Sequence, residues 1–398
     1  MRYLFCAPSS EGQLYPAIGI ALKLRQLGHS ISFATHDSAN DLLQRLSVDI
    51  IDVPGVNDAW LIANWFTEYA ILRQLKHLVF AVKAFRPDVI VGSMFTLGMV
   101  ALRLSSSIPI TVLGQCTYLY AAPEGQADQL SHELYTRREW RRRDVAEHLR
   151  RALKVLGVST EALDIESRLN GDLFLLRSIP DLEGDISSLP PTVHFAGDCL
   201  WDLDEPDPEL EAWLAESKTR SRQVIYVQQA KIFDLPSFWP DMVESLRNSD
   251  MSIVASTGRM AHCPTALPSN FYVRPHLPQK RVMEQASVVL CSGTTTPVLG
   301  AITHGVPLVM IPTGGEQPDA AEICCQAGVA VELNADGLTA EQISNAIRSV
   351  DGNEAMRERA RHLARQFNAM RSIDPAVSLL QRLAKSQLPM QRDALQFV

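Results

Sequence analysis

The sequence contains no long hydrophobic run. Its longest nearly apolar segment, Val89–Leu102, is too short to cross a bilayer as a helix. At the start, MRYLFCAP has only a short apolar run before the polar residues SSEG, so we interpret it as a first strand and not as a signal peptide. We therefore expect a cytoplasmic protein without a transmembrane segment.

Basic residues and cysteines are also few. The 37 Lys and Arg are outnumbered by 45 Asp and Glu, and the net charge is −8. A general nucleic-acid binder needs a basic surface to displace counterions, so no nucleic-acid partner is expected. The seven cysteines are odd in number and lack framework spacing, and the adjacent Cys324 and Cys325 match no zinc motif. This pattern favours reduced thiols in a cytoplasmic protein.

What remains is typical of a soluble globular chain. The length of 398 residues suits two domains that each bury a core, and 46% of the residues are hydrophobic. No internal repeat or low-complexity tract is visible.

Short β-rich runs alternate with helical patterns along both halves of the chain. In the first half we predict strands at Tyr3–Ala7, Ser30–Ala34, Asp49–Val53, Asp88–Val91 and Ile110–Leu113, with a helix at Tyr15–Leu27. In the second half we predict strands at Gln223–Val227, Ser252–Ala255, Phe271–Val273, Ser287–Leu290, Pro307–Ile311 and Val329–Leu333. Helices are predicted at Ala340–Val350, Glu354–Met370 and Pro375–Gln387.

This alternation predicts an α/β fold with two doubly wound, Rossmann-like parallel sheets. The acidic, proline-containing Asp202–Glu209 has little to bury and is interpreted as an interdomain linker. The expected organisation is an N-terminal domain (1–201), a linker (202–222), a second domain (223–374) and a C-terminal helix with its tail (375–398). Because ligands of open α/β sheets bind beyond the carboxyl ends of the strands, two such domains predict one cleft.

Two long excursions interrupt the first half. The segment Asn57–Ala84 is helical and rich in aromatic residues, and Thr117–Leu156 is long and charged. Such excursions are usually functional, so they are candidates for an acceptor pocket. The candidate residues for its wall are Trp60, Trp65, Phe66 and Tyr69.

One stretch resembles a known signature. Residues 274–321, RPHLPQKRVMEQASVVLCSGTTTPVLGAITHGVPLVMIPTGGEQPDAA, resemble the donor-binding signature of family 1 glycosyltransferases with the GT-B fold. EGQLYPAIGIALKLRQLGHSISFAT, PDVIVGS, FAGDCLWD and IVASTGR resemble further segments of that family, in the same order. The resemblance to these macrolide, antibiotic and plant natural-product enzymes implies inverting sugar transfer from a UDP- or TDP-sugar, without a metal or other cofactor.

The resemblance also implies donor-binding residues. Gly293, Thr294, Thr295 and Thr296 would open a helix whose free N–H groups and dipole face a diphosphate, although such a turn can also merely cap a helix. Glu316 and Gln317 match a pair that holds sugar hydroxyls; solvated loop residues are the alternative. His276, Leu277 and Gln279 match positions near the nucleobase, and Gly258 lies in the IVASTGR segment. His276 is almost as well explained as a structural histidine.

The catalytic positions depart from the family pattern. The expected base histidine is Gln13, which follows Gly12, and the aspartate that would orient the base is Ser93. Glutamine cannot accept a proton near neutral pH, so Gln13 can orient an acceptor but cannot deprotonate it. The base and its orienting residue are lost together.

Donor positions depart as well. The phosphate-contacting histidine is Cys291, the following glycine is Ser292, and the ribose-binding glutamate is Leu299. A loop expected to contain glycine reads Gln228-Gln229-Ala230-Lys231; alanine restricts this turn, whereas Lys231 can meet phosphate charge.

A replacement for the base is not obvious. His36, Asp37 and Glu11 lie near expected strand ends, where each can reach an acceptor or can be an ordinary loop residue. An acceptor that is already ionised or intrinsically nucleophilic, such as a carboxylate or an amine, needs little deprotonation. The basic TRREWRRRD segment, Thr136–Asp144, can recruit an acidic partner or can form a solvated helix with i,i+4 ion pairs.

Two functions follow from these patterns. The first is a hexosyltransferase that acts on a small hydrophobic natural product, either as a monomer or as a homodimer. The second is a catalytically silent homologue that binds a ligand or activates a partner enzyme. A hydrolase or epimerase has no positive signature in the sequence.

Overall fold

The structure, a computed structural model, describes residues 1–121, 131–184, 186–203, 205–229, 237–258 and 267–392. It divides into two compact units, which are described here one at a time. Unit 1 comprises Met1–Pro180, Asp185–Trp201 and Met370–Val398. Unit 2 comprises Asp181–Gly184 and Asp202–Ala369.

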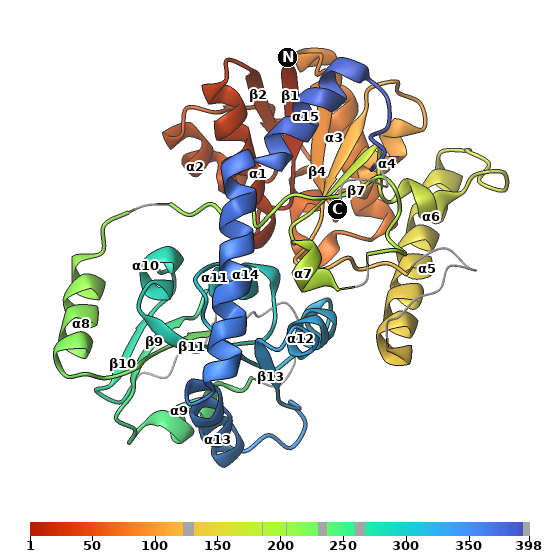
Figure 1. Cartoon of the computed structure of the whole chain (residues 1–398). Coiled ribbons are helices and arrows are strands. Elements are labelled where there is room, and N and C mark those ends of the chain that lie inside the picture. Colours follow the sequence, from red (N-terminus) through yellow and green to blue (C-terminus); the bar gives the residue numbers. More distant parts are fainter. Residues whose placement is uncertain (122–130, 185, 204, 230–236, 259–266, 393–398) are drawn as a thin grey trace. The chain divides into compact units, whose positions relative to one another are not determined.

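Unit 1 is built on a seven-stranded sheet in the order β3-β2-β1-β4-β5-β6-β7, and every strand pair is parallel (Figure 1). The strands are β1 (Arg2–Cys6), β2 (Ser30–Ala34), β3 (Asp49–Ile50), β4 (Val89–Ser93), β5 (Ile110–Leu113), β6 (Leu173–Leu176) and β7 (Val193–Phe195). Chain order reverses between β1 and β4, so this position is the switch point at which such sheets usually bind ligands.

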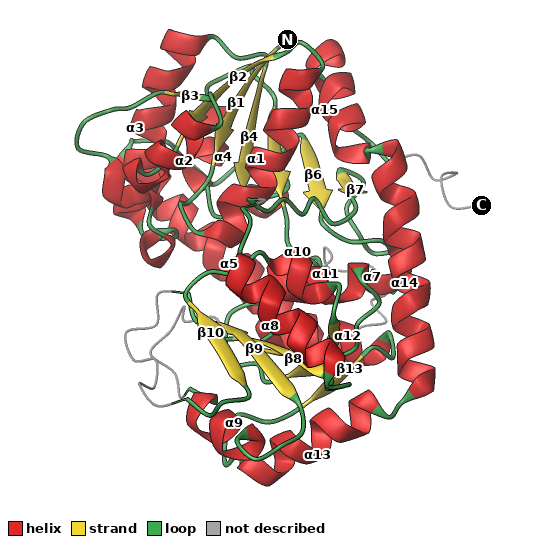
Figure 2. Cartoon of the chain, turned by 90° about the vertical axis from the view of Figure 1, so that its left-hand side faces the viewer, coloured by secondary structure: helices red, strands yellow, loops and turns green. Residues whose placement is uncertain are grey.

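Helices cover both faces of this sheet because alternate strand residues point to opposite sides (Figure 2). Tyr3 and Phe5 pack in one core cluster with residues of α1 and α15, whereas Leu4 and Cys6 pack in another with residues of α3, α4 and α5. The helices of this unit are α1 (Glu11–Gln26), α2 (Asn40–Arg45), α3 (Glu68–Phe85), α4 (Leu97–Arg103), α5 (His132–Val155), α6 (Ile165–Arg168) and α15 (Pro375–Ser386), with short 3₁₀ turns η1 (Asp37–Ala39), η2 (Asn57–Trp60) and η3 (Ile62–Asn64).

Unit 2 contains a second parallel sheet, with six strands in the order β10-β9-β8-β11-β12-β13. The strands are β8 (Val224–Gln228), β9 (Ser252–Ser256), β10 (Phe271–Arg274), β11 (Ala286–Cys291), β12 (Leu308–Met310) and β13 (Ala330–Glu332). The other elements assigned mainly to this unit are α7 (Pro180–Glu183), α8 (Pro208–Thr219), α9 (Trp239–Leu246), α10 (Gln279–Met283), α11 (Thr295–Thr303), α12 (Gln317–Gln326), α13 (Ala340–Asp351) and α14 (Glu354–Ile373). The order again reverses between β8 and β11.

The predicted fold class, two doubly wound parallel sheets, is confirmed. Two of the strands, β6 and β7, were not predicted from the sequence. Their apolar runs, LFLL and VHF, are short and have no flanking helix of recognisable period. Within the range expected to be a linker, α8 forms instead from Pro208, capped by the Asp207 carboxylate, which accepts the N–H of Leu210 at 3.0 Å. Proline is well placed in the first turn of a helix.

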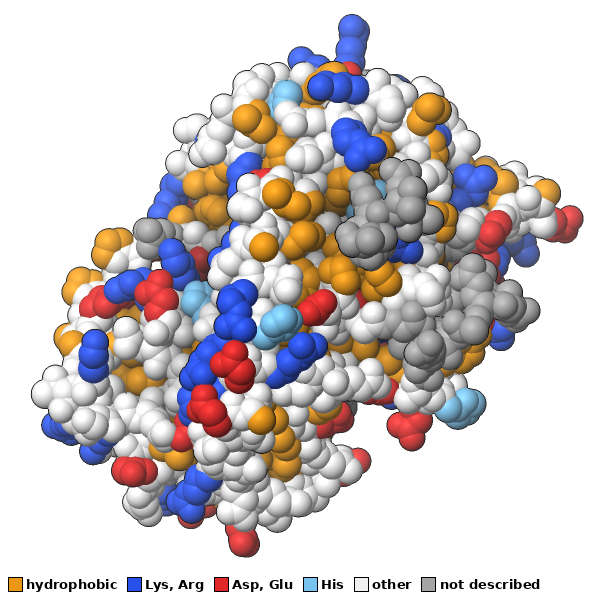
Figure 3. Space-filling model, in the orientation of Figure 1, with side chains coloured by type: hydrophobic (Ala, Val, Ile, Leu, Met, Phe, Trp, Pro, Cys, Tyr) orange, Lys and Arg blue, Asp and Glu red, His pale blue; other side chains and the backbone are white. Residues whose placement is uncertain are grey.

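Charged side chains on the surface are largely mixed in sign. Along α14, which Figure 3 shows with interspersed blue and red side chains, Arg361 pairs with Glu354 at 2.8 Å and Arg365 pairs with Glu358 at 3.2 Å. Solvent-exposed pairs of this kind contribute little to stability. Among the described residues, no helix is both long enough and apolar enough to cross a membrane.

Candidate active site

The carboxyl edge of the second sheet collects most of the predicted donor residues. In the register of β8 and β11, Gln228 lies opposite Cys291, and Cys291 is aligned with Met310 of β12. The loops that leave these three strands therefore start side by side. They contain Gln229, the Ser292–Thr296 turn and the Pro312–Gln317 turn, at the switch point of the sheet.

The start of α11 has the features of an anion site. Thr294 is the N-cap residue, but its side chain makes no capping hydrogen bond. The helix begins with Thr295 and Thr296 directly after the end of β11, and its third residue is Pro297, which has no N–H. A helix start without a side-chain cap carries partial positive charge and favours an anion.

Gly293 connects β11 to this helix start. Its φ is +94°, a region that residues other than glycine rarely adopt. A Cβ atom there would lie 3.0 Å from Cε of Met310 and 3.1 Å from the carbonyl oxygen of Gln317. The backbone of the β11 loop therefore touches the start of α12.

We expect Gly293→Ala to destabilise the protein by about 1–3 kcal/mol, because the backbone would be strained and the β12 loop would have to move. The measurement is chemical denaturation. Gly337→Ala is the matched control for backbone strain alone, since Gly337 has a φ of +69° and a Cβ atom added to it would meet no neighbouring atom within 4 Å. Equal losses in the two variants would contradict a packing role for Gly293.

Gln317 is the most informative of the predicted sugar-binding residues. Its side-chain Oε1 accepts the backbone N–H of Thr313 at 2.9 Å and the Thr313 hydroxyl at 3.0 Å. Gln317 is only 1% exposed, and its Nε2 is buried without a hydrogen-bond partner among the described residues. A buried amide N–H₂ without an acceptor is costly, so it marks a position where a ligand oxygen is expected. Glu316 precedes it as the half-buried N-cap residue of α12.

A second buried polar atom without a hydrogen-bond partner lies at the end of β8, which pairs with β11. Oε1 of Gln228 is buried without a partner, while its main-chain oxygen accepts the N–H of Ser292 at 3.3 Å. Gln229 accepts the hydroxyl of Ser237 at 2.8 Å through its side-chain oxygen. Lys231 lies outside the described residues. In the sequence, Gln228 was noted only as part of a loop that departs from the family pattern. Nothing in that loop indicates a buried amide without a hydrogen-bond partner.

The residues that replace the family's polar groups are withdrawn from the surface. Cys291, Ser292 and Leu299 are each 0% exposed, and Leu299 faces the core from the middle of α11. Leu299 therefore cannot contact a ribose. The buried thiol of Cys291 is too short to reach the phosphate that a histidine at this position would contact.

The predicted nucleobase residues are divided between structural and exposed roles. Gln279 donates from Nε2 to the carbonyl of Thr296 at 3.1 Å, so its amide fastens α10 to the first turn of α11. His276 is exposed, and Leu277 is half-buried. Gly258 follows β9 with a φ of +56° and donates its N–H to the carbonyl of Pro275 at 2.8 Å. Contacts of Leu277 and His276 with a nucleobase stay a prediction.

In unit 1, the three predicted catalytic residues follow neighbouring strands. Cys6, the last residue of β1, is aligned with Ala34 of β2 and with Gly92 of β4. Gln13 lies in the first turn of α1, His36 follows β2, and Ser93 ends β4. The register thus brings their backbone segments to one edge of the sheet.

Local hydrogen bonds occupy two of these side chains. Ser93 is 2% exposed, and its hydroxyl oxygen accepts the N–H of Phe95 at 3.2 Å. Nδ1 of His36 lies 3.0 Å from the backbone nitrogen of Ser38, where it caps η1, and 3.0 Å from Oδ1 of Asp37. These local contacts hold the His36 ring beside η1 and engage its Nδ1.

The aromatic residues of the excursion Asn57–Ala84 divide between the core and the partly exposed surface. Trp60 is 0% exposed, and its indole N–H donates to Nδ1 of the buried His77 at 2.9 Å, so Trp60 belongs to the core and presents no surface to an acceptor. Trp65 packs edge-on against Phe66, with ring centroids 4.9 Å apart, and against Phe95, at 4.8 Å. All three rings are half-buried. Phe95 escaped the sequence analysis because it lies outside the aromatic excursion.

Tyr69 contacts other residues than these three rings do. It is 50% exposed, its hydroxyl donates to the Asp58 carboxylate at 3.1 Å, and the Arg73 guanidinium lies 4.4 Å from its ring centroid. These contacts describe a surface cluster around Asp58.

The basic segment forms part of α5, and its arginines are engaged. Arg142 donates to Glu139 at 2.8 Å, and Arg143 pairs with the same carboxylate at 2.5 Å. Arg138 is 3% exposed and donates to the Thr117 hydroxyl at 2.8 Å. These contacts agree with the expectation of a helix with internal ion pairs.

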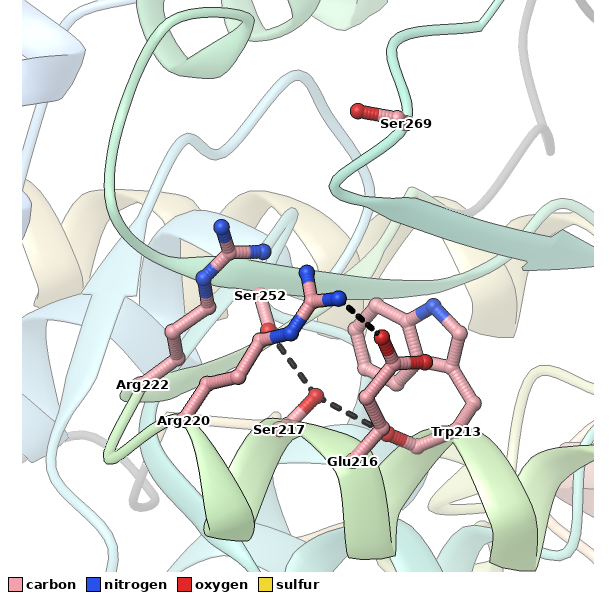
Figure 4. Close-up of a pocket in the computed structure, with 7 residues that line it drawn as sticks. All are labelled: Trp213, Glu216, Ser217, Arg220, Arg222, Ser252 and Ser269. Carbon is pink, nitrogen blue, oxygen red and sulfur yellow. Dashed lines mark hydrogen bonds and ion pairs between the residues drawn. The ribbon is translucent and has the colours of Figure 1, made fainter.

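A small cavity beside α8 is a different kind of site. It holds about 30 Å³, which suits a water molecule and not a sugar. Ser217 donates to the Ser252 hydroxyl at 2.9 Å, and Arg220 pairs with Glu216 at 2.6 Å (Figure 4). Because Ser252 begins β9, the cavity lies at the amino end of the strands, away from the candidate donor edge.

Known proteins resemble this chain in sequence and in structure. Residues 254–380 match the family described as UDP-glucoronosyl and UDP-glucosyl transferase. The crystal structure of the glycotransferase of kitacinnamycin has the same fold, with a TM-score of 0.74 over 98% of this chain and 99% of that chain at 22% identity. The chain resembles family 1 glycosyltransferases in the sequence of residues 254–380 and in its fold. Its two parallel-sheet units have the GT-B architecture.

Individual glycosyltransferases match different shares of this chain. The 4'-demethylrebeccamycin synthase of Lentzea aerocolonigenes is 27% identical over 53% of this chain, and the alignment spans only half of that relative's length. The NDP-glycosyltransferase YjiC of Bacillus subtilis is 24% identical over 95% of this chain and 96% of its own length.

Proposed function

We propose that this protein transfers a hexose or deoxyhexose from a UDP- or TDP-sugar to a small hydrophobic natural product. The proposal rests on the carboxyl edge of the second sheet. There the loop that leads into α11, which has no side-chain cap, packs against Gln317, a residue whose buried Nε2 has no hydrogen-bond partner. Phosphate and sugar hydroxyls are the ligand groups that complement these two features.

The donor residues would act on different parts of the nucleotide sugar. The N–H groups at the start of α11 would stabilise the charge that grows on the diphosphate as it leaves, which requires no metal ion. Gln317 would donate from Nε2 to a sugar hydroxyl, while Glu316 would accept a hydrogen bond from a neighbouring hydroxyl. His276 and Leu277 would contact the base. Attack from the opposite side of the sugar ring would invert the anomeric carbon.

Unit 1 would hold the acceptor. Trp65, Phe66 and Phe95 give a half-buried aromatic surface that suits an apolar ring system. Gln13, next to Gly12 in the first turn of α1, would orient the nucleophile by hydrogen bonding.

We expect a nucleoside diphosphate to raise the melting temperature, because a ligand at 100 times its Kd stabilises the folded state by about 2.7 kcal/mol. Differential scanning fluorimetry with UDP, TDP and GDP at millimolar concentration is the measurement. Glu316→Ala should keep this shift and lose sugar transfer, since Glu316 would contact the sugar and not the nucleotide. Glu322→Ala, on the same helix, is the control.

A catalytically silent homologue is the second candidate. It is favoured by Gln13, Ser93 and the buried Leu299, which remove the expected base, its orienting residue and a ribose contact. Mass spectrometry of a panel of nucleotide sugars and acceptors separates the two functions. A nucleotide-induced shift without any glycosylated product would favour the silent protein, whereas product that disappears in Glu316→Ala would favour the enzyme.

A further inference from the structure

Arg177 is a buried guanidinium at the carboxyl edge of the first sheet. It directly follows β6, is 1% exposed, and is among the largest fully buried side chains of the described chain. Its Nε donates to the main-chain oxygen of Asp198 at 3.1 Å, and Nη1 donates to the main-chain oxygen of Gly12 at 3.3 Å. Nη2 is buried and has no hydrogen-bond partner.

The contact with Gly12 has a local explanation in the sequence. Inside a helix, the carbonyl of residue 12 would accept the N–H of residue 16. Residue 16 is proline, which has no N–H, so this carbonyl is left without its helical donor. Arg177 supplies the missing hydrogen bond through Nη1. This role accounts for one N–H of the guanidinium and leaves Nη2 unexplained.

The positive charge is also without a carboxylate partner. Asp198 is 3% exposed at its side chain, and its carboxylate pairs with Arg371 at 2.6 Å instead. Burial raises the pKa of the nearby Cys199 thiol to about 12, so this group stays neutral. Among the described residues, no aspartate or glutamate forms an ion pair with Arg177. The Asp198 carboxylate acts on Arg177 through its charge but makes no hydrogen bond to it. A buried charge without a carboxylate in direct contact is costly unless an anion binds beside it.

Other groups at this edge point to the same conclusion. Gln115, 1% exposed, accepts the N–H of Arg177 through its main-chain oxygen at 3.0 Å, yet its side-chain Nε2 has no partner. The hydroxyl of Ser178, at 0% exposure, is also unpartnered. The N-cap residue of α1, Ser10, makes no side-chain capping bond. The side chain that carries the unpartnered Nη2 thus contacts the first turn of α1, and the segments of Gln115 and Ser178 adjoin Arg177 through the backbone.

We propose that Arg177 and the first turn of α1 form an anion site that binds the acceptor as a carboxylate, which is the nucleophile of the transfer. This inference rests on the proposed function and specifies its acceptor class. Gln13 follows Gly12 directly, so the carboxylate lies where the family pattern has a base histidine. A carboxylate nucleophile needs no general base, which accounts for the joint loss of the base at Gln13 and of its orienting residue at Ser93.

The reaction balances without a proton transfer. A carboxylate oxygen forms a bond to the anomeric carbon of the donor sugar, and the bond from that carbon to the diphosphate oxygen breaks. The electron pair and one negative charge leave with the nucleoside diphosphate. The product is a glycosyl ester. Arg177 acts on the carboxylate through its charge, which is strong in a buried environment, and holds it for attack.

The first test compares acceptors on the unmodified protein. With a panel of UDP- and TDP-sugars, 2-naphthoic acid, its methyl ester and 2-naphthalenemethanol are offered at equal concentration, and products are identified by mass spectrometry. We expect a glycosyl ester from the acid and at least tenfold less product from the ester and the alcohol. Hydroxylamine should cleave the product, as it cleaves esters and not ordinary glycosides.

The second test removes the charge. Arg177→Met should lower kcat/KM for the acid at least 30-fold, mainly through KM, whereas Arg177→Lys should retain a larger share of the activity because it keeps a cation. A retained melting-temperature shift with nucleoside diphosphate shows that the variant is folded. If Arg177→Met does not fold, the Arg177→Lys variant and the acceptor comparison decide the question.

The outcomes separate this inference from the proposed function. Transfer to the alcohol as efficient as transfer to the acid overturns the anion site and leaves the glycosyltransferase in place. A nucleotide-induced shift with no product from any acceptor overturns both the carboxylate nucleophile and the enzyme. Equal activity of Arg177→Met and the unmodified protein on the acid overturns the role of Arg177 alone.

Discussion

Gln317→Glu is expected to lower kcat/KM for sugar transfer about 100-fold, the usual loss when a preorganised hydrogen-bond donor is removed. The substitution preserves the shape of the side chain. One carboxylate oxygen can still accept the N–H and hydroxyl of Thr313, which Oε1 now accepts at 2.9 and 3.0 Å. The other replaces the orphaned Nε2, so a donor becomes a charged acceptor.

The new charge adds a second penalty in the proposed site. Gln317 touches Gly293 through its main-chain oxygen and Cβ, and Gly293 leads directly into the start of α11. A carboxylate there would repel the diphosphate that the helix start is proposed to hold. Steady-state kinetics with the best donor found in the panel gives kcat and KM separately, and fluorimetry gives the nucleotide-induced shift.

The matched control is Gln326→Glu, which makes the same chemical change at the exposed carboxyl end of α12. It should leave kcat/KM within about twofold of the original value, since surface substitutions of this kind have small effects. Unchanged kinetics in Gln317→Glu would mean that Nε2 faces no substrate. A transfer rate that falls equally in both variants would point to a general effect of added negative charge.

The fold was predictable because hydrophobic period and turn residues act locally. The strand at Ser30–Ala34 and the helix starting at Ala340 were predicted at their observed first residues, where Thr339 and Gln342 form a capping box. The strands β6 and β7 were missed because runs of three or four apolar residues carry no distinguishing period. Their place in the sheet depends on tertiary pairing with β5 and with each other.

The candidate site was predictable only as far as the chain motifs reach. The turn at Gly293 and the pair Glu316-Gln317 were recognised from short contiguous sequence motifs. The parallel pairing of β11 and β12 brings both segments to the carboxyl edge of the second sheet. The orphaned amides and the Arg177 guanidinium could not be predicted, because a polar residue's partners are set by segments distant in sequence. Gly12 and Arg177, for example, are 165 positions apart.

Trp60 also shows that the burial of a side chain could not be predicted from its residue type. Its aromatic ring and its place in a long excursion favoured an acceptor wall, but burial is a property of the packed core and not of the residue type. The ring is 0% exposed, and η2 carries it between β1 and α3, where the indole N–H donates to His77. Burial lowers the pKa of His77, which keeps its ring neutral and able to accept this bond at Nδ1.

Trp60→Ala is therefore expected to lower the free energy of unfolding by about 3–5 kcal/mol, the usual cost of removing a large buried aromatic ring. The loss should spread toward the predicted acceptor residues, because the Trp60 carbonyl accepts the N–H of Ser9 at 3.2 Å, just before α1. Urea denaturation at pH 7 measures the change. Trp140→Ala, at a residue that is 65% exposed, is the matched control and should change stability by less than about 0.5 kcal/mol.

Trp60→Phe divides this loss into packing and hydrogen bonding. Phenylalanine fills much of the space but leaves Nδ1 of His77 without its donor, while Nε2 still donates to the carbonyl of Ile51 at 2.7 Å. An unsatisfied buried acceptor costs about 1–3 kcal/mol, so Trp60→Phe should fall between the original protein and Trp60→Ala. If Trp60→Ala instead keeps its stability while acceptor binding weakens, then Trp60 forms part of the acceptor surface after all and its assignment to the core is wrong.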